Sequence, residues 1–262
     1  MRFPPLLIAA LLAACCSGCQ SLLPEMGDKG LASANSARLA RATLNGGDAA
    51  GAISLFETAL RTHPDDYNSR LGLAEAQFRA GDLDSARVNF IKAAALRPEA
   101  LDPVLTLARI ATLQRHLDEA CRRYADARSL ADRTDPRPLV GLGAVYDLEG
   151  DPGKAQALYR DALDARPDDL AARNNLGLSL ALSGHPRQAV EVLLDLSRNP
   201  AAPPQTRQNL ALAYGVMGNR QASESVLLSG DLDARAIQAN LAYYDMLRHR
   251  LSAPAAGGDA RP

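Results

Sequence analysis

The chain is poor in aromatic residues and in cysteine, and neither sign of charge dominates. It contains no tryptophan, only 4% of its 262 residues are aromatic, and its formal net charge is -1. Because strands favour aromatic and β-branched residues, a composition rich in alanine and leucine favours packed helices over sheets. A near-neutral chain also has no broad electrostatic attraction for nucleic acid. Three of the four cysteines lie between Cys15 and Cys19, which argues against a disulfide framework.

Residue patterns that carry catalysis are also missing from the sequence. It has no glycine-rich phosphate loop and no Gly-x-Ser-x-Gly elbow. The four histidines lack metal-ligand spacing to one another or to Cys121, which follows the small residue Ala120 and is interpreted as buried packing. The aspartate pairs at 65–66 and 168–169 are interpreted as helix caps at solvated turns. The sequence therefore predicts no enzyme, no catalytic or metal-binding residue and no cofactor.

The first residues have the pattern of a bacterial export signal. Arg2 precedes an apolar run over 3–14, which is shorter than the roughly 20 residues that span a bilayer. Leu-Ala-Ala-Cys at 12–15 resembles a bacterial lipobox, in which the cysteine is acylated and becomes the first residue. This predicts a lipoprotein signal peptide over 1–14, a lipid on Cys15, and a tether within 15–32. Ser-Gly-Cys at 17–19 leaves Cys19 as the alternative acylation site.

A lipid on either cysteine predicts a protein that is anchored to a membrane without spanning it. The residue after the acylated cysteine would be Cys16 or Gln20. Neither is the aspartate that commonly retains lipoproteins in the inner membrane. We therefore expect lipid anchoring to the outer membrane, facing the periplasm. An ordinary signal peptide with incidental cysteines is the alternative interpretation.

A period of 34 residues organises most of the remaining chain. The residues at one recurring turn position are, in order, Gly47, Gly81, Arg115, Gly150, Gly184 and Gly218, with one residue inserted before the fourth. A fixed period in this range is typical of a helical repeat array. The units are predicted at 33–66, 67–100, 101–135, 136–169, 170–203 and 204–232. A capping helix over 233–251 and a disordered tail over 252–262 are expected to follow.

Each unit contains two helical patterns that meet at this turn. Glycine ends the first helix, because a left-handed backbone costs little only for glycine. A small residue five positions later lets the two helices touch. An aromatic residue four positions further on then fills the space beside it, at Phe56, Phe90, Tyr124 and Tyr159. A proline ends the second helix of three units, at Pro64, Pro98 and Pro167, because it has no N–H to donate.

These offsets resemble the tetratricopeptide repeat. The fourth unit matches that pattern most fully, at Leu142, Gly143, Tyr146, Gly150, Ala155, Tyr159, Ala162 and Pro167. The third unit departs from it, with Arg115 in place of glycine and Asp132 in place of proline. The resemblance implies an all-α fold, a right-handed tetratricopeptide-repeat solenoid of about six helix pairs with a C-terminal capping helix.

The same resemblance implies a concave face, built from the first helix of each unit, that binds protein segments. Asn175 and Asn209 occupy the same position in adjacent units, and an amide can both donate to and accept from a peptide backbone. The alternative is that each asparagine only ties down its own inter-helix turn. The face lacks basic residues interleaved with aromatics, so we expect no nucleic acid there. The candidate partner-binding residues on it are Phe78, Arg109, Asn174, Asn175, Gln208 and Asn209.

Two blocks near the C-terminal end carry a second resemblance. They are Arg-Gln-Asn-Leu-Ala-Leu-Ala-Tyr-Gly at 207–215 and Asn-Leu-Ala-Tyr-Tyr at 240–244. Together with the lipobox and the repeats, they resemble the assembly lipoproteins of tight-adherence (Tad, or Flp) pili. The resemblance implies a pilotin-like accessory protein that supports the outer-membrane secretin of a type IVb pilus, and it adds Tyr214 to the partner-binding candidates. The alternative is a general periplasmic adaptor lipoprotein of the cell envelope.

Overall fold

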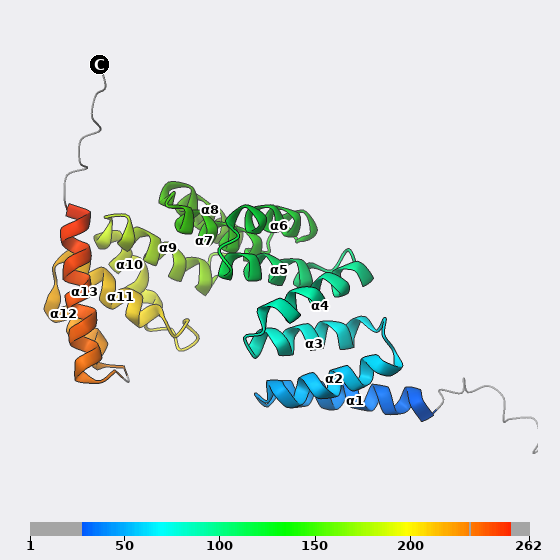
Figure 1. Ribbon diagram of the computed structural model, residues 1–262. Helices are drawn as coiled ribbons and strands as arrows, with labels where there is room; N and C mark the ends of the chain where they lie inside the picture. The colour runs from blue at the N-terminus through cyan, green and yellow to red at the C-terminus, as the bar shows by residue number, and fades with distance from the viewer. Residues whose placement is uncertain (1–27, 231, 253–262) are drawn as a thin grey trace, which may run out of the picture. The chain divides into compact units, whose positions relative to one another are not determined.

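A computed structural model describes residues 28–230 and 232–252, and every regular element within these ranges is an α-helix. The helices are α1 (Asp28–Asn45), α2 (Ala49–Thr62), α3 (Tyr67–Arg79), α4 (Leu83–Leu96), α5 (Leu101–Leu113), α6 (Leu117–Leu130), α7 (Arg137–Glu149), α8 (Pro152–Ala165), α9 (Leu170–Leu182), α10 (Pro186–Leu196), α11 (Thr206–Met217), α12 (Arg220–Leu228) and α13 (Ala234–Ser252). Consecutive helices pack against each other in pairs, as α1 does with α2, α5 with α6 and α7 with α8, and α13 follows the pair α11 and α12 (Figure 1). The predicted all-α fold of helix pairs with a C-terminal helix is confirmed.

Several of the predicted segments lie outside the described residues. They are the signal peptide, the acylated cysteine at Cys15 or Cys19, and the tail beyond residue 252. Within the described residues, no helix combines the length and the apolar character needed to cross a membrane.

The turn within each helix pair has the left-handed backbone that the sequence predicted. Five glycines at this position have φ between 83° and 93°, and Arg115 takes the same role with φ 63°. The next residue closes the turn by donating its N–H to a carbonyl five residues earlier, as Asp151 does to Tyr146 at 2.9 Å. Asp151 also caps α8, because its carboxylate accepts from the Lys154 N–H at 3.1 Å. One short turn thus ends the first helix and starts the second.

The structure divides into two compact units, residues 1–89 and 90–262, and each unit contains several of the repeats. In the first unit, α1, α2 and α3 enclose a core around Phe56, which is 1% exposed. Gly72 on α3 lies against the Phe56 ring, and a Cβ at this glycine would be 2.3 Å from the ring's Cζ. The glycine is therefore needed for α3 to approach α2 this closely.

The second unit repeats this arrangement with different partners. Gly141 faces the Tyr124 ring, and a Cβ there would lie 2.1 Å from the ring's Cε1. Gly143 stands in the same relation to Tyr159, with a separation of 2.6 Å. Tyr159 is 1% exposed, so the aromatic position predicted to fill the space between helices is buried.

The C-terminal helix α13 packs against α11 and α12 (Figure 1). Its apolar stripe is buried, and Tyr244 lies over Gly215 of α11, where a Cβ would come within 2.6 Å. At the edge of this contact, Arg220 of α12 forms an ion pair with Asp245 at 2.7 Å. α13 therefore covers the apolar side of the last helix pair, as expected of a cap. The members of the buried stripe are Ile237, Leu241, Tyr244 and Leu247.

Candidate partner-binding groove

A hollow of about 490 Å³ lies along the first helices of the second unit. We call it the α7 hollow, because Val140, Gly141 and Ala144 of α7 are part of its lining. α5 contributes Arg109 and Leu113 to one wall, and α9 and the residue before it contribute Ala171, Asn175 and Asp169 to the other. Arg109 and Asn175, both predicted from the sequence as partner-binding residues, therefore meet at one site.

The hollow lies where α7 carries smaller side chains than the neighbouring repeats have at the same positions. Gly141 occupies the repeat position that holds Asn175 in the next unit. Ala144 likewise stands where the next unit has Leu178. A Cβ at position 141 would lie 2.1 Å from Cε1 of Tyr124, so the Tyr124 ring occupies the side-chain direction of Gly141 and both residues line the hollow.

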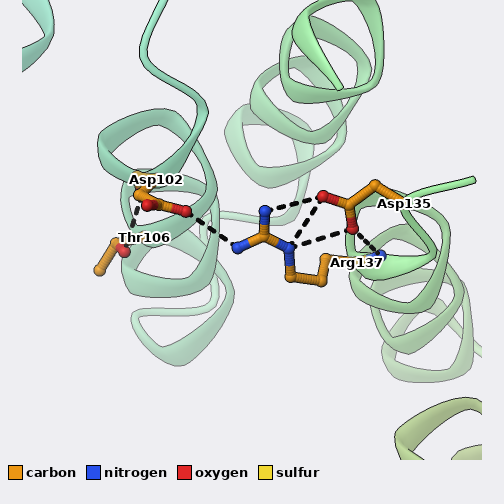
Figure 2. A network of polar contacts seen from close by, with 4 residues as sticks. All are labelled: Asp102, Thr106, Asp135 and Arg137. Atoms are coloured by element: carbon orange, nitrogen blue, oxygen red, sulfur yellow. Dashed lines mark hydrogen bonds and ion pairs between the residues drawn. The ribbon is translucent and has the colours of Figure 1, made fainter. Parts of the chain in front are cut away.

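One wall of the hollow is fixed by a polar network around Arg137, at the start of α7 (Figure 2). The Arg137 guanidinium donates to both oxygens of Asp135, at 2.7 to 3.0 Å, and to Asp102 of α5 at 2.9 Å. The hydrogen bonds from Arg137 hold the pKa of Asp135 below its usual range. The two carboxylates together exceed the single positive charge of Arg137, and the network joins the first helices of adjacent repeats.

The opposite end of the α5 wall carries Arg109. Burial raises the pKa of the Tyr124 hydroxyl, while a hydrogen bond with Thr112 and the charge of Arg109 act in the opposite direction. Arg109 is therefore close enough to interact with Tyr124, and all three residues line the hollow. The Tyr124 hydroxyl is neutral at physiological pH and supplies an aromatic, uncharged surface beside the guanidinium.

The predicted asparagines are brought together by hydrogen bonds between α9 and α11. Oδ1 of Asn174 accepts from the Thr206 hydroxyl at 3.1 Å and from Nδ2 of Asn209 at 3.0 Å. Nδ2 of Asn174 donates to Oδ1 of Asn175 at 3.3 Å. Asn209 is thus tied to the preceding repeat, an arrangement that neither sequence interpretation included.

These hydrogen bonds and the burial of the side chains give Asn174 and Asn175 different roles. Asn174 is 7% exposed and joins two helices, whereas Asn175 is half-buried and reaches the α7 hollow. Because Asn175 accepts through Oδ1, its Nδ2 group is the part that remains to donate to a ligand in the hollow. Asn174 is therefore placed to position Asn175 rather than to contact a partner itself.

The other predicted residues lie elsewhere. Gln208 is exposed and lines a different hollow, of about 610 Å³, beside the loop between α10 and α11. Tyr214 is half-buried against the core cluster that includes Tyr244. Phe78 is half-buried on α3, in the first unit. These three residues do not join Arg109 and Asn175 in the α7 hollow.

Apart from Arg109 and Asn175, the residues that line the hollow were not among the predicted candidates. Tyr124 was interpreted as core packing, Gly141 has no side chain to notice, and Arg137 stands beside the inserted residue that shifts the register. The signal that could have placed Tyr124 in the lining is the change from Asn175 to Gly141 at the same repeat position, because a glycine lets the aromatic ring of the preceding repeat approach α7 closely.

A second polar contact joins α7 to α9 away from the hollow. The Asp147 carboxylate accepts from the Ser179 hydroxyl at 2.6 Å and from the Tyr159 hydroxyl at 2.9 Å. Burial raises the pKa of Asp147, and these two hydrogen bonds act against that rise. Among the residues that the structure describes, no cluster of three or more His, Cys, Asp or Glu side chains could hold a metal ion.

Comparison with known proteins gives matches to repeat proteins. Two segments, 44–88 and 149–204, match family models described as tetratricopeptide repeat. A peroxisomal targeting signal receptor of Debaryomyces hansenii is 25% identical over 185 residues, which cover 68% of this chain and 31% of that protein. The chain therefore spans less than a third of the length of this curated relative.

Solved structures show the same fold. A thermophilic TPR protein of Thermus thermophilus aligns with a TM-score of 0.59 and 25% identity, over 70% of this chain and 98% of that one. The pilF protein of Pseudomonas aeruginosa aligns with a TM-score of 0.62 and 17% identity, over 81% of this chain and 99% of that one. At 17% identity, the second likeness concerns the fold alone.

Proposed function

We propose that the chain is a scaffold that binds segments of other proteins along the first helices of its repeats. The matches of residues 44–88 and 149–204 to tetratricopeptide-repeat models support this proposal. The observation that carries this proposal is the α7 hollow, where Arg109 and the Asn175 amide stand over an apolar floor. A mixture of apolar surface and a few fixed polar groups suits a peptide, whose side chains and backbone need both.

We further propose that the scaffold is anchored by a lipid on Cys15, with Cys19 as the alternative, and that it faces the periplasm from the outer membrane. The lipobox-like segment at 12–15 and the small residues before Cys19 support this proposal. Replacing each cysteine singly by alanine and following palmitate incorporation tests it. Loss of the label in one variant identifies the acylated residue, and a label retained in both variants contradicts the lipid anchor at these residues.

The proposed partner system is the Tad, or Flp, pilus and its outer-membrane secretin. Support comes from the two sequence blocks at 207–215 and 240–244, which lie on α11 and α13. These blocks contact each other, because Gly215 of the first accommodates Tyr244 of the second. The contact is buried, so the two blocks belong to one packed core at the C-terminal end of the array.

Secretin assembly in cells that lack this chain tests the pilus proposal. We expect loss of the heat-resistant secretin multimer on a gel and loss of surface pili, both restored by the wild type. A groove variant, Arg109→Ala with Asn175→Ala, is expected not to restore them. Arg160→Ala with Gln221→Ala is the matched control, because it also removes one arginine and one carboxamide side chain, from exposed positions on α8 and α12.

The outcomes separate the two candidate functions. Normal multimer and normal pili in the deleted cells would contradict the pilus role and favour the general periplasmic adaptor of the cell envelope. Restoration by the groove variant as well as by the control would show that secretin assembly does not use the groove.

A further inference from the structure

We infer that the second hollow, which Gln208 lines beside the loop between α10 and α11, binds an acidic segment of a partner protein. We call it the loop hollow, and its volume is about 610 Å³. The inference rests on the proposed scaffold function and deepens it, because it adds a second binding site and states the chemistry of the segment bound there. Every lining residue belongs to the second unit.

The loop hollow lies between two connections of the array. One wall is the connection 197–205 between α10 and α11, together with the first residues of α11. The other wall is the end of α12 and the connection that follows it, through Val226, Gly230 and Leu232. The α7 hollow shares no lining residue with this one, so a segment bound here occupies a separate site.

The wall formed by 197–205 is held in shape at several points. Pro200, Pro203 and Pro204 all line the hollow, and a proline ring fixes its own φ. Thr206, which is 1% exposed, ties the end of this connection to Asn174 of the preceding repeat through a hydrogen bond of 3.1 Å. A ligand therefore meets a wall whose backbone is already ordered, which lowers the entropy lost on binding.

The charge of the lining favours an anionic ligand. Arg198 and Arg207 are both exposed residues of the lining, and none of the lining residues in the described part of the chain is acidic. Arginine is suited to carboxylates, because its planar guanidinium can donate two parallel hydrogen bonds to one of them. Two such residues in one hollow suit a segment with two carboxylates.

Three acidic residues flank the lining in the sequence. Asp195, on α10, lies 3.9 Å from Arg173 in an ion pair and does not line the hollow. Asp233 accepts the Ala236 N–H at 2.7 Å at the start of α13 and does not line the hollow either. Asp231 lies outside the described residues, so its effect on binding is measured directly below. The described lining itself carries two positive charges and no negative one.

The remaining surface of the hollow favours an apolar side chain beside the carboxylates. Val226 and Leu232 are partly buried against the core and line the hollow together with Pro203. An apolar side chain of the partner that covers them removes apolar area from water on both sides. Gln208, predicted from the sequence as a partner-binding residue, can donate to or accept from the backbone of the same segment.

The loop hollow also accounts for an exposed part of the sequence block at 207–215. Arg207 and Gln208 are exposed, and both line the hollow. Core packing explains the apolar residues of the block, whereas the loop hollow gives its first two polar residues a ligand. The buried members of the block are Leu210, Ala211, Leu212, Ala213 and Gly215.

Tryptophan fluorescence tests the inference, because the chain itself contains no tryptophan. The probes are two capped peptides, Gly-Ser-Glu-Glu-Trp-Gly and Gly-Trp-Glu-Glu-Ser-Gly, titrated with the full-length protein in detergent micelles, with micelles alone as the blank. Both orders are used because the hollow does not prescribe the direction of the segment. We expect saturable binding with a blue-shifted emission for at least one probe. The matching peptide with Gln-Gln in place of Glu-Glu should bind roughly fivefold more weakly or worse.

Charge reversal locates the binding. Arg198→Glu with Arg207→Glu should weaken binding of the Glu-Glu probes by roughly tenfold or more, and should make a Lys-Lys peptide the better ligand. Arg128→Glu with Arg160→Glu is the matched control, because it changes the net charge equally at exposed positions on α6 and α8, and it should bind like the wild type. Asp231→Asn should bind the probes at least as tightly as the wild type, because it removes a negative charge that flanks the lining in the sequence.

Gly230→Phe tests the apolar half of the site. Only the Leu227 carbonyl oxygen lies within 4 Å of a Cβ built on Gly230, at 3.5 Å, so a side chain fits there without a collision. A phenylalanine at this lining position competes for the space of the ligand and should weaken probe binding by roughly fivefold or more. Circular dichroism monitors folding. A peptide with phenylalanine in place of tryptophan should displace the probe better than one with serine in that place.

Two results would overturn the inference. One is the absence of saturable binding by either probe up to millimolar concentration, and the other is equal binding by the wild type and the Arg198, Arg207 double variant. Either result, combined with loss of secretin assembly in the groove variant, would leave the scaffold function standing and remove only the loop hollow. Probe binding that the double variant loses, combined with normal secretin multimer in cells that lack the chain, would support the loop hollow and contradict the pilus role.

Discussion

The left-handed turn at Arg115 provides a sharp test of how backbone conformation contributes to the stability of this array. Five of the six equivalent turns use glycine, whereas Arg115 adopts φ 63° with a Cβ present. A left-handed conformation costs a non-glycine residue ~1–2 kcal/mol. Glycine does not have this cost. It does, however, give the unfolded chain more conformational entropy, which lowers the free energy of unfolding by about 0.4–1 kcal/mol. Arg115→Gly should therefore raise the free energy of unfolding by about 0.8 kcal/mol, the difference between the midpoints of these two ranges.

The reverse substitution at Gly150 gives a matched control. Its φ is 83°, and a Cβ built on it has no heavy atom within 4 Å, so Gly150→Ala introduces backbone strain without a collision. We expect it to lower the free energy of unfolding by about 0.8 kcal/mol, by the same arithmetic with the sign reversed. Gly150→Asn should cost less, because asparagine tolerates the left-handed region better than alanine does.

Urea unfolding followed by circular dichroism measures both changes. Amide hydrogen exchange in 105–125 should accompany it, because repeats can open locally without global unfolding. The reasoning is refuted if Arg115→Gly is no more stable than the wild type while Gly150→Ala is unaffected. A stabilisation seen by exchange near residue 115 but absent at residue 150 would be the expected local signature.

Three further substitutions test the contacts between helices. Asn174→Ala leaves the Thr206 hydroxyl, in a residue that is 1% exposed, without its acceptor. It should therefore lower the free energy of unfolding, measured in urea, by ~1–3 kcal/mol. An unchanged urea midpoint would mean that the hydroxyl finds another partner. Gly143→Ala places a Cβ 2.6 Å from the Tyr159 ring and should cost ~1–3 kcal/mol by thermal melting, and a wild-type melting temperature would show that α7 shifts freely. Asp147→Asn tests pH dependence: burial raises the pKa of Asp147 in the folded chain, so the associated stability is present below the unfolded pKa and is lost as pH rises through the folded value. The variant should therefore lose less stability than the wild type between acidic and neutral pH, measured as urea midpoints across that interval, and parallel pH profiles would contradict the assignment.

The sequence predicts the helices and turns well because the period constrains them directly. Glycines such as Gly150 indicate both a left-handed residue and the end of a helix, and buried positions such as Tyr159 follow at fixed offsets. Arg115 shows the limit of this argument. The sequence indicates a departure from the pattern there, but the helices on both sides impose the same turn, so tertiary packing overrides the preference of the residue.

The candidate site is less predictable because it depends on relations between repeats. Arg109 and Asn175 could be placed on the inward face from their repeat positions, and the structure brings them to one hollow. The burial of Asn174 could not be foreseen, since it arises from Thr206 of the next repeat. The Tyr124 ring fills the side-chain direction of Gly141, and a periodic pattern of large residues does not indicate that this buried ring also lines the hollow.

The polar contacts along the first helices of the second unit have a consequence for the order of the repeats. Each junction uses different chemistry: an ion pair from Arg137 to α5, a carboxylate at Asp147 that accepts from Ser179, and an amide at Asn174 that accepts from Thr206. A repeat moved to another place, duplicated or exchanged would meet a neighbour without the matching group and leave a polar atom without its bond. The repeats are alike in backbone but are not interchangeable, so the chain specifies the order of its repeats as well as their fold.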